Sequence, residues 1–423
     1  MPRLERDAYD VPRWLIKAEV NHPQKPRVRR FAAGPFIASR RAKRATPDCG
    51  DLRVKKPVRS RRQFLADAAS AAALGVFGTA SQSGVSAFAT PRTTTRAESA
   101  AAPIPYGTAV RSDALVTDRS YRAAIVANCQ IIVPEGEMKW PDVRPSRAEY
   151  RFEKADVIMD FARDNGIAVR GHTLAWYGGM PAWTDDIGDR LEAERELVTH
   201  IETVVGRYRG VIPSWDVVNE PLEDWPKNAR SLRPSIWTRR LGPDYLPIAL
   251  RAAAGADPSV QLVLNEYDIE FRGPRFAARR KALLQLLRQL RDRGVPLHAL
   301  GLQSHLFADR EIDRDGLQSL LSEVRELGLD VLVTELDVVD YELPGQVSER
   351  DALVAGMAEK YLQAVFEVVR PKAILTWGLS DRYTWVPTYF KRLDGMPNRP
   401  LPLDAEFQHK PFFDVIQQFR RAA

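Results

Sequence analysis

Two glutamates in this sequence are placed where carboxylates could act as a pair. Glu220 lies near the end of residues 215–221, a β-rich stretch that Pro221 prevents from pairing further. Glu335 follows a second β-rich run in the same way. Glycoside hydrolysis needs such a pair, because one carboxyl group acts as acid and base while the other attacks carbon or activates water. Taken alone, Glu220 could equally be a turn acid that faces solvent.

Other polar and aromatic residues follow apolar runs in the same manner. Tryptophans and histidines directly after buried strands are not what solvation alone selects. Tryptophan rings pack against the C–H faces of sugars, and amides, histidine and lysine hydrogen-bond the hydroxyls, although any single tryptophan could simply pack a loop. These residues are Glu135, Glu137, Lys139, His172, Trp176, Trp183, Asn219, Asn265, Glu266, Gln303, His305, Asp337, Trp377, Asp381 and Trp385.

A metal site is the alternative use of these carboxylates and histidines. The histidines nearby have no H-x-x-x-H or comparable spacing. No G-x-G-x-x-G follows a predicted strand, so no dinucleotide site is indicated either. We therefore expect neither a metal ion nor a cofactor.

The elements that must position these residues form a repeating pattern of short apolar runs and amphipathic segments. Eight such units favour a closed (β/α)₈ TIM barrel with a single catalytic domain over an open, doubly wound sheet. In a barrel, Glu220 and Glu335 would end the fourth and seventh strands and face one another across the mouth. The predicted strands cover residues 106–110, 129–133, 167–170, 214–218, 260–264, 299–303, 330–334 and 373–377.

Helical spacing lies between these runs. Leu283, Leu287 and Leu290 share one face before Gly294, a predicted C-terminal cap. A second predicted face contains Leu191, Val198, Ile201, Val205 and Tyr208. Ser348 with Asp351 predicts an N-terminal capping box for a third helix.

Five motifs in order resemble glycoside hydrolase family 10, the retaining endo-β-1,4-xylanases. The similarity runs from about Tyr106 to Phe419, and the order of the motifs makes it specific although each alone is weak. The motifs are residues 171–176 (GHTLAW), 215–221 (WDVVNEP), 301–305 (GLQSH), 334–337 (TELD) and 377–381 (WGLSD).

The resemblance implies a role for each matching position. Glu220 matches the acid/base and Glu335 the nucleophile, which His305 and Asp337 would orient. The residues that match the subsite where the bond breaks are His172, Trp176, Asn219 and Gln303, with Trp377 and Trp385 as its aromatic floor and ceiling. Glu135 and Lys139 match contacts to the next sugar outward. The implied substrate is xylan or a xylo-oligosaccharide.

A retaining mechanism asks different things of the two glutamates. Glu335 must be ionised to attack, and its negative charge, about 5 to 5.5 Å away, would help Glu220 to keep its proton. Once the glycosyl-enzyme forms, that charge is lost and Glu220 can act as a base toward water. Asn219 would hydrogen-bond the 2-hydroxyl of the sugar.

Two positions depart from the family pattern. Gly136 stands where the family usually has asparagine, so a contact to the distal sugar is missing, and Tyr177 replaces a histidine near the cleavage point. Gly136 prompts one alternative, the same mechanism on β-1,4-glucosidic or mixed substrates. A catalytically silent carbohydrate-binding barrel is the non-enzymatic alternative.

The first 103 residues are predicted to precede the catalytic domain at 104–423. Residues 60–89 resemble a twin-arginine signal peptide, with Arg61 and Arg62, an Ala-rich run and an A-x-A-like site at Ala87 to Ala89. The Ala-rich run is too short and too polar for a membrane anchor. Residues 90–103 are a linker, and 1–59 are a basic disordered extension or reflect a start codon placed too early. We expect export, to the periplasm or the exterior.

The distribution of charge and the number of cysteines indicate which partners and disulfides to expect. The isoelectric point near 9.3 comes from the leader, since residues 1–89 hold 18 Lys and Arg against 7 Asp and Glu, leaving 44 against 48 in the rest. The catalytic domain therefore gives no reason to expect a nucleic-acid partner, and we expect a monomer. Cleavage would remove Cys49 and leave Cys129, a predicted buried residue, with no internal disulfide.

Overall fold

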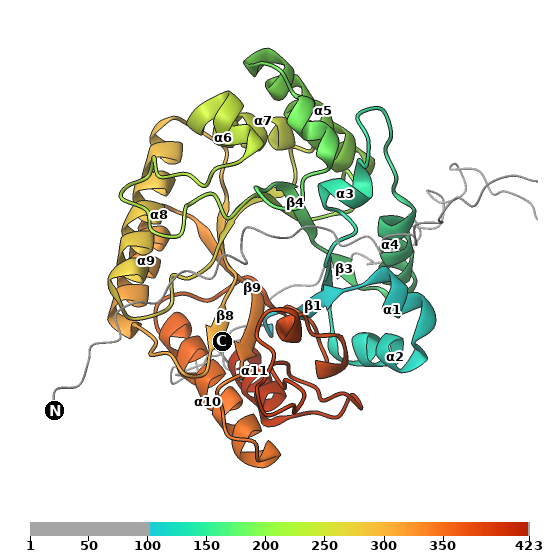
Figure 1. Ribbon diagram of the computed structural model, residues 1–423, viewed down its shortest axis with the longest axis vertical. Helices are drawn as coiled ribbons and strands as arrows, with labels where there is room; N and C mark the ends of the chain where they lie inside the picture. Colours follow the sequence, from blue (N-terminus) through green and yellow to red (C-terminus); the bar gives the residue numbers. More distant parts are fainter. Residues whose placement is uncertain (1–101, 422–423) are drawn as a thin grey trace, which may run out of the picture. The chain divides into compact units, whose positions relative to one another are not determined.

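The structure, a computed structural model, describes residues 102–421 of the 423-residue chain. In this range, parallel strands form a barrel and helices surround it, and the chain passes around the ring from its first helices to its last (Figure 1). The predicted extension (1–59), signal peptide (60–89) and all but the last two residues of the linker (90–103) lie outside the described residues. No described helix is both long and apolar enough to cross a membrane.

The strands pair in the order β3-β2-β1-β10-β9-β7-β6-β5-β4. Its two ends, β3 and β4, are separated in the chain only by Arg170, so the barrel closes and the open-sheet alternative is excluded. The strands are β1 (Tyr106–Val110), β2 (Ile131–Pro134), β3 (Ala168–Val169), β4 (Gly171–Ala175), β5 (Ser214–Asn219), β6 (Gln261–Glu266), β7 (Ala299–Leu302), β8 (His305–Phe307), β9 (Asp330–Val339) and β10 (Ile374–Thr376).

The helices cover the outside of the barrel. They are α1 (Ser112–Thr117), α2 (Arg119–Asn128), α3 (Trp140–Val143), α4 (Glu153–Asn165), α5 (Arg190–Arg207), α6 (Ile236–Leu241), α7 (Tyr245–Ala256), α8 (Pro274–Asp292), α9 (Arg314–Glu326), α10 (Val347–Phe366) and α11 (Pro411–Arg421). Single turns of 3₁₀ helix occur at η2 (Ala182–Asp186), η3 (Gly242–Asp244), η4 (Asp381–Tyr383) and η5 (Val386–Thr388).

The predicted (β/α)₈ architecture is confirmed, and every predicted strand overlaps an observed one. The third is divided at Arg170, whose backbone N–H bonds the carbonyl of Ile132 while its side chain is buried. The seventh predicted strand, residues 330–334, corresponds to β9. It continues well beyond its predicted end, because β9 pairs first with β7 and then with β8.

The core has two parts, as alternation along a barrel strand requires. On β9, Val331 and Val333 pack in the large cluster that includes helix residues, while Leu332 between them belongs to a small cluster. That small cluster draws its other members from five further barrel strands and their ends. We infer that it fills the barrel interior, because successive side chains on a strand point to opposite faces.

Three sequence predictions about helices and burial are confirmed. Leu283, Leu287 and Leu290 are all buried on α8. Gly294 has φ +59°, in the left-handed region that a helix C-terminus often requires. Cys129 is buried.

One helix prediction is correct only in part and another is wrong. Of the predicted face of α5, Ile201, Val205 and Tyr208 are buried and Val198 is half-buried, whereas Leu191 in the first turn is 76% exposed. The capping box at Ser348 does not form, since α10 begins at Val347 and no side chain caps it. Asp351 instead accepts two hydrogen bonds from the Arg399 guanidinium, at 2.8 and 2.7 Å.

Candidate active site

Glu220 directly follows β5, and its backbone is held in an uncommon conformation. Its φ of +52° lies in the left-handed region, which costs a residue with a side chain about 1 to 2 kcal/mol. The Glu220 N–H donates to the carbonyl of Asn265 on the neighbouring strand at 2.9 Å. Such conformations persist where surrounding contacts fix them, and they cluster at functional sites.

Glu335 lies within β9, where the pairing of β9 changes from β7 to β8. Its N–H donates to the carbonyl of Gln303 at 3.0 Å, in the gap between those two strands. Its side chain is 6% exposed and accepts from Asn265 Nδ2 at 2.6 Å and from His305 Nε2 at 3.2 Å. Both oxygens of this buried carboxylate therefore have a donor.

Electrostatics keep Glu335 ionised. Burial opposes the charge, but the hydrogen bond from His305 and the nearby His172 and His305 rings together hold the pKa of Glu335 below its ordinary value. Burial likewise opposes a charge on His305, but Asp337 and Glu335 raise the pKa of its imidazole well above the usual range. A charged imidazole can donate from both nitrogens, which matches its two carboxylate contacts.

His305 and Asp337, which the sequence predicts to orient Glu335, are in contact with one another. His305 Nδ1 lies 3.0 Å from Asp337 Oδ1, and the other oxygen of Asp337 accepts from Trp385 Nε1 at 2.7 Å. The Trp385 ring also meets the His305 ring edge to face, with centroids 5.1 Å apart. Asp337 thus fixes both the imidazole beside Glu335 and one of the predicted aromatic walls.

Amide side chains connect the two glutamates. Asn219 Nδ2 and Gln303 Nε2 donate to Glu220 Oε1 at 2.9 and 3.0 Å. Asn265 Nδ2 bonds both Asn219 Oδ1, at 2.9 Å, and Glu335 Oε1. Since all three amides are at most 3% exposed, they form a buried, continuous support for both carboxylates.

Asn265 is among the polar residues that follow the apolar runs, but it is the member of this support for which no role was predicted. It is opposite Asn219 in the register of β5 with β6, so two adjacent asparagines at matching strand ends were the available signal. Thr334 Oγ1 donates to its Oδ1 at 2.7 Å and so fixes the amide orientation. Gly301 leaves the space: a Cβ there would lie 2.2 Å from Asn265 Oδ1.

His172 is held by two charged residues that sequence reasoning also missed. Its Nδ1 lies 2.9 Å from Asp216 Oδ2, and Arg170 Nη1 donates to the same oxygen at 2.7 Å. Burial works against the charge of Asp216, but Arg170 and His172 lower the pKa of its carboxyl group. Charged residues inside two strands that are otherwise apolar were the signal that could have found them.

Predicted sugar-binding residues gather around Lys139. Its Nζ lies 4.9 Å from the centroid of Trp176 and 5.5 Å from that of Trp377, and Trp377 meets His172 edge to face at 5.1 Å. Burial raises the pKa of Glu135 although Lys139 acts to lower it. The predicted substrate-binding residues therefore lie around Lys139, or beside the two glutamates and the residues that hold them.

Four polar or aromatic residues that the sequence placed beside the strands have structural contacts instead. Glu137 accepts from the Ser112 N–H at 2.6 Å, and Glu266 pairs with Arg279 at 2.5 Å. Asp381 binds Lys410 Nζ at 2.8 Å. Trp183 donates to the Arg144 carbonyl at 3.1 Å and packs near Trp140.

The two departures from the family pattern have different surroundings. A Cβ at Gly136 would meet only Asp142 Oδ2, at 3.7 Å, so the position has room for a side chain that this chain lacks. Tyr177 packs its ring under the guanidinium of Arg233, whose Cζ lies 4.4 Å from the ring centroid.

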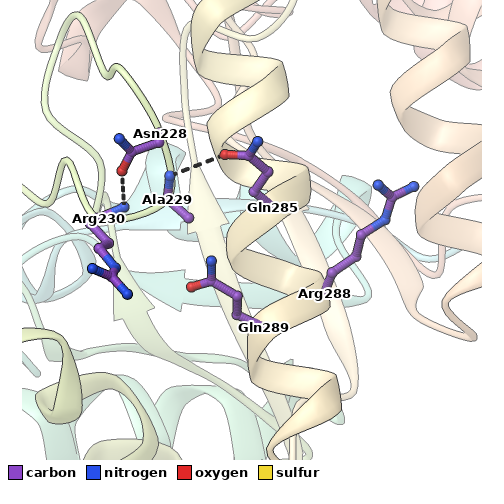
Figure 2. A pocket seen from close by; sticks show the side chains of 6 residues that line it. All are labelled: Asn228, Ala229, Arg230, Gln285, Arg288 and Gln289. Carbon is purple, nitrogen blue, oxygen red and sulfur yellow. Dashed lines mark hydrogen bonds between the residues drawn. The ribbon is translucent and has the colours of Figure 1, made fainter.

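An open depression of about 460 Å³ lies on α8, and none of the active-site residues described above lines it (Figure 2). Gln285, Arg288 and Gln289 line it from the helix, and Asn228, Ala229 and Arg230 line it from the loop after β5. The Ala229 N–H donates to Gln285 Oε1 at 3.3 Å, which attaches the loop to the helix. The depression therefore marks where the outer end of this loop is anchored.

The site is thus a pair of buried, separately supported carboxylates with aromatic and hydrogen-bonding residues around them. Among residues 102–421, no group of three or more His, Cys, Asp or Glu is arranged to hold a metal ion. Fold and site together are those of a glycoside hydrolase on a (β/α)₈ barrel.

Comparison with known proteins specifies the family. Residues 95–419 match Glycosyl hydrolase family 10, and the chain belongs to this family. It is 34% identical over 326 residues to endo-1,4-beta-xylanase B of Paenibacillus barcinonensis, covering 74% of this chain and 94% of that protein. It is 33% identical over 289 residues to endo-1,4-beta-xylanase B of Thermotoga neapolitana, covering 68% and 80%.

Solved structures agree with the sequence comparison. The crystal structure of xylanase 10B from Thermotoga petrophila RKU-1 in complex with xylobiose is similar with a TM-score of 0.69 and 29% identity. The match covers 76% of this chain and 94% of that one. The resemblance to family 10 predicted from the five motifs is therefore confirmed, and the protein is a glycoside hydrolase.

Proposed function

We propose that this protein is a retaining endo-1,4-β-xylanase that hydrolyses internal bonds of xylan by double displacement. Membership of family 10 and the names of the relatives support the substrate class. The observation that carries the mechanism is the unequal support of the two carboxylates. Glu335 accepts from Asn265 and from His305, whereas the donors that Glu220 has within residues 102–421 are two neutral amides on one oxygen.

In the first step, Glu335 attacks the anomeric carbon while Glu220 gives its proton to the departing glycosidic oxygen. The C–O bond to the leaving sugar breaks and a covalent bond to Glu335 forms. The positive charge of His305 keeps Glu335 ionised and ready to attack. In the second step, Glu220 takes a proton from water, which displaces Glu335 and restores both groups.

The remaining site residues bind and orient the sugar. We assign His172, Trp176, Asn219 and Gln303 to the subsite where the bond breaks, with Trp377 and Trp385 as its aromatic walls. Glu135 and Lys139 contact the next sugar outward. Their clustering around the two carboxylates supports these roles.

Azide distinguishes the roles of the two glutamates. Glu335→Ala should lose hydrolysis of an aryl β-xylobioside, and azide should restore turnover by attacking from the face that Glu335 occupies, which gives an α-xylobiosyl azide. Glu220→Ala should keep the first step on a substrate with a good leaving group and give a β-azide, because azide then attacks the glycosyl-enzyme. Persistent hydrolysis by Glu335→Ala, or the same azide anomer from both variants, contradicts the assignment.

Digestion of glucuronoxylan tests the substrate and the endo action together. We expect a ladder of xylo-oligosaccharides early in the reaction. Xylobiose alone from the start would contradict an endo enzyme. Gly136 favours one alternative substrate class, β-1,4-glucosidic or mixed polymers, so carboxymethyl cellulose is the comparison: a higher rate on it than on xylan would support that alternative.

Localisation and organisation are further proposals. We propose that residues 60–89 direct export by the twin-arginine pathway and are removed, and that residues 104–423 act as a monomeric catalytic domain. The paired arginines, Ala-rich run and A-x-A-like site support the first point. Substitution of Arg61 and Arg62 by lysine should retain the precursor inside the cell; export of that variant would contradict it.

A further inference from the structure

The loop after β5 returns an arginine to the side of Glu220. Leu222 and Leu232 form an antiparallel bridge, so the loop doubles back on itself. At its end, the Arg233 N–H donates to the carbonyl of Pro221, the residue after Glu220, at 2.8 Å. Arg233 is thus fixed beside the predicted acid/base by the backbone itself.

The guanidinium of Arg233 is held in place from three elements. Its Cζ lies 4.4 Å from the ring centroid of Tyr177, after β4, and 5.6 Å from that of Tyr267, after β6. Its Nη2 donates to Asp224 Oδ1 at 3.0 Å and also to the Tyr267 hydroxyl. The side chain is 9% exposed, so the cation has few ways to move away.

The positive charge of this buried arginine is only partly neutralised. Its Nε is buried and has no hydrogen-bond partner. The carboxylate paired with it, Asp224, also accepts from the Tyr267 hydroxyl, at 2.7 Å. Close by, Glu266 and Arg279 are paired with each other and offset one another's charge. Arg233 is thus a cation that lacks one of its hydrogen bonds and shares its counter-ion, and its charge acts on Glu220.

The electrostatics of the cluster agree with this geometry. Burial acts to lower the pKa of Arg233, but Tyr267, Tyr177, Asp224 and Glu220 together raise it. Burial also raises the pKa of Tyr177, and the charge of Glu220 raises it further. Arg233, Tyr177 and Glu220 thus interact electrostatically with one another.

We propose that Arg233 is the positioning residue for the acid/base, a fixed cation that stabilises the carboxylate Glu220 becomes when it protonates the leaving oxygen. The inference rests on the proposed function, because it needs Glu220 to be the acid/base. Tyr177 and Tyr267 hold the guanidinium, and Asp224 moderates its charge. Removing the cation should then make Glu220 hold its proton more tightly, and removing the counter-ion should make Glu220 release it more readily.

The pH dependence of kcat/KM on phenyl β-xylobioside tests this, because its alkaline limb reports the loss of the proton that Glu220 must donate. Arg233→Gln should move that limb upward by about half to one pH unit, since the carboxylate loses a nearby cation. Asp224→Asn should move it downward, and Arg233→Lys should leave it close to the wild-type position. On the 2,4-dinitrophenyl substrate, whose leaving group needs no proton, these differences should shrink.

Arg230→Gln is the matched control, because Arg230 lies on the same loop but is exposed at its outer end (Figure 2). The alkaline limb of the Arg230→Gln enzyme should stay at the wild-type position. Thermal unfolding identifies any variant that does not fold; if Arg233→Gln fails, the opposite shift in Asp224→Asn with an unmoved limb in Arg233→Lys supports the proposal. Shifts in the same direction, or no shift in folded variants, overturn it. An inactive wild type overturns the proposed function instead.

Discussion

Replacing Asn265 by alanine tests how the site keeps Glu335 ionised. Asn265 Nδ2 donates to Glu335 Oε1 at 2.6 Å, and Asn265 is fully buried. A hydrogen bond to a charged group contributes about 1.5 to 3 kcal/mol. Since one pKa unit corresponds to about 1.4 kcal/mol, its loss should raise the pKa of Glu335 by about one to two units.

The sign follows from which form of Glu335 attacks. Glu335 reacts as the carboxylate. A higher pKa of Glu335 therefore moves the acid limb of kcat/KM to higher pH by the same amount, about one to two units. Activity should therefore be lost first under acidic conditions, while the alkaline limb, set by Glu220, stays nearly in place. The assay is a pH profile of aryl β-xylobioside hydrolysis between pH 3 and 9.

A matched control lies on the same strand. Gln261 begins β6, and its Nε2 donates to Asp330 Oδ2 at 2.9 Å, an amide-to-carboxylate bond at the other end of the strand from Asn265. Gln261→Ala should leave both limbs unchanged. A folded Asn265→Ala enzyme with the wild-type acid limb would refute the idea that this amide keeps Glu335 ionised.

Two further substitutions test the packing around the site. Gly301→Ala places a Cβ 2.2 Å from Asn265 Oδ1 and 3.0 Å from Thr334 Cγ2, so it should lower the free energy of unfolding by about 1 to 3 kcal/mol and reduce kcat. Gly206→Ala on α5 is the control, because a Cβ there meets nothing within 4 Å, and it should keep stability and activity. Equal stability and activity of the two variants would contradict this. His200 is buried against Trp140 with both ring nitrogens unpartnered, and burial lowers its pKa well below the ordinary value. The unfolded chain therefore binds a proton that the folded one does not, and the free energy of unfolding should fall below about pH 6.5 by up to about 1.4 kcal/mol per pH unit. His200→Phe should reduce that fall in urea unfolding at pH 7 and pH 5, and an identical fall in both proteins would refute the assignment.

The sequence predicted the barrel because strand position depends on a strong local pattern. Short β-rich runs bounded by polar residues fall at eight regular places, and each overlaps an observed strand. Their polar C-terminal ends meet at one mouth of a barrel whatever the details of packing. Glu220 and Glu335 could therefore be predicted as a pair from the positions of their strands alone.

Residues that act through another residue were harder to predict. Asn265, Asp216 and Arg170 are defined by hydrogen bonds across neighbouring strands, and those depend on register, which a single strand does not reveal. Arg233 is brought to Glu220 by a loop that doubles back, an event outside any periodic pattern.

Local helix signals failed where tertiary contacts compete. Ser348 and Asp351 have the types of a capping box, but Asp351 makes two bonds to Arg399, a partner 48 residues away in the chain. On α5, the apolar Leu191 is exposed while Glu196 and His200 are buried, because ion pairs with Arg144 and stacking on Trp140 decide that face.

Trapping the covalent intermediate tests the central claim most directly. A 2-deoxy-2-fluoro-xylobioside with a good leaving group should inactivate the enzyme, because the fluorine slows the second step more than the first. Mass spectrometry of the digested protein should find one fluoroxylobiosyl group on the peptide that contains Glu335, at that residue. A label on another residue, or turnover with no labelled enzyme at all, would contradict double displacement through Glu335.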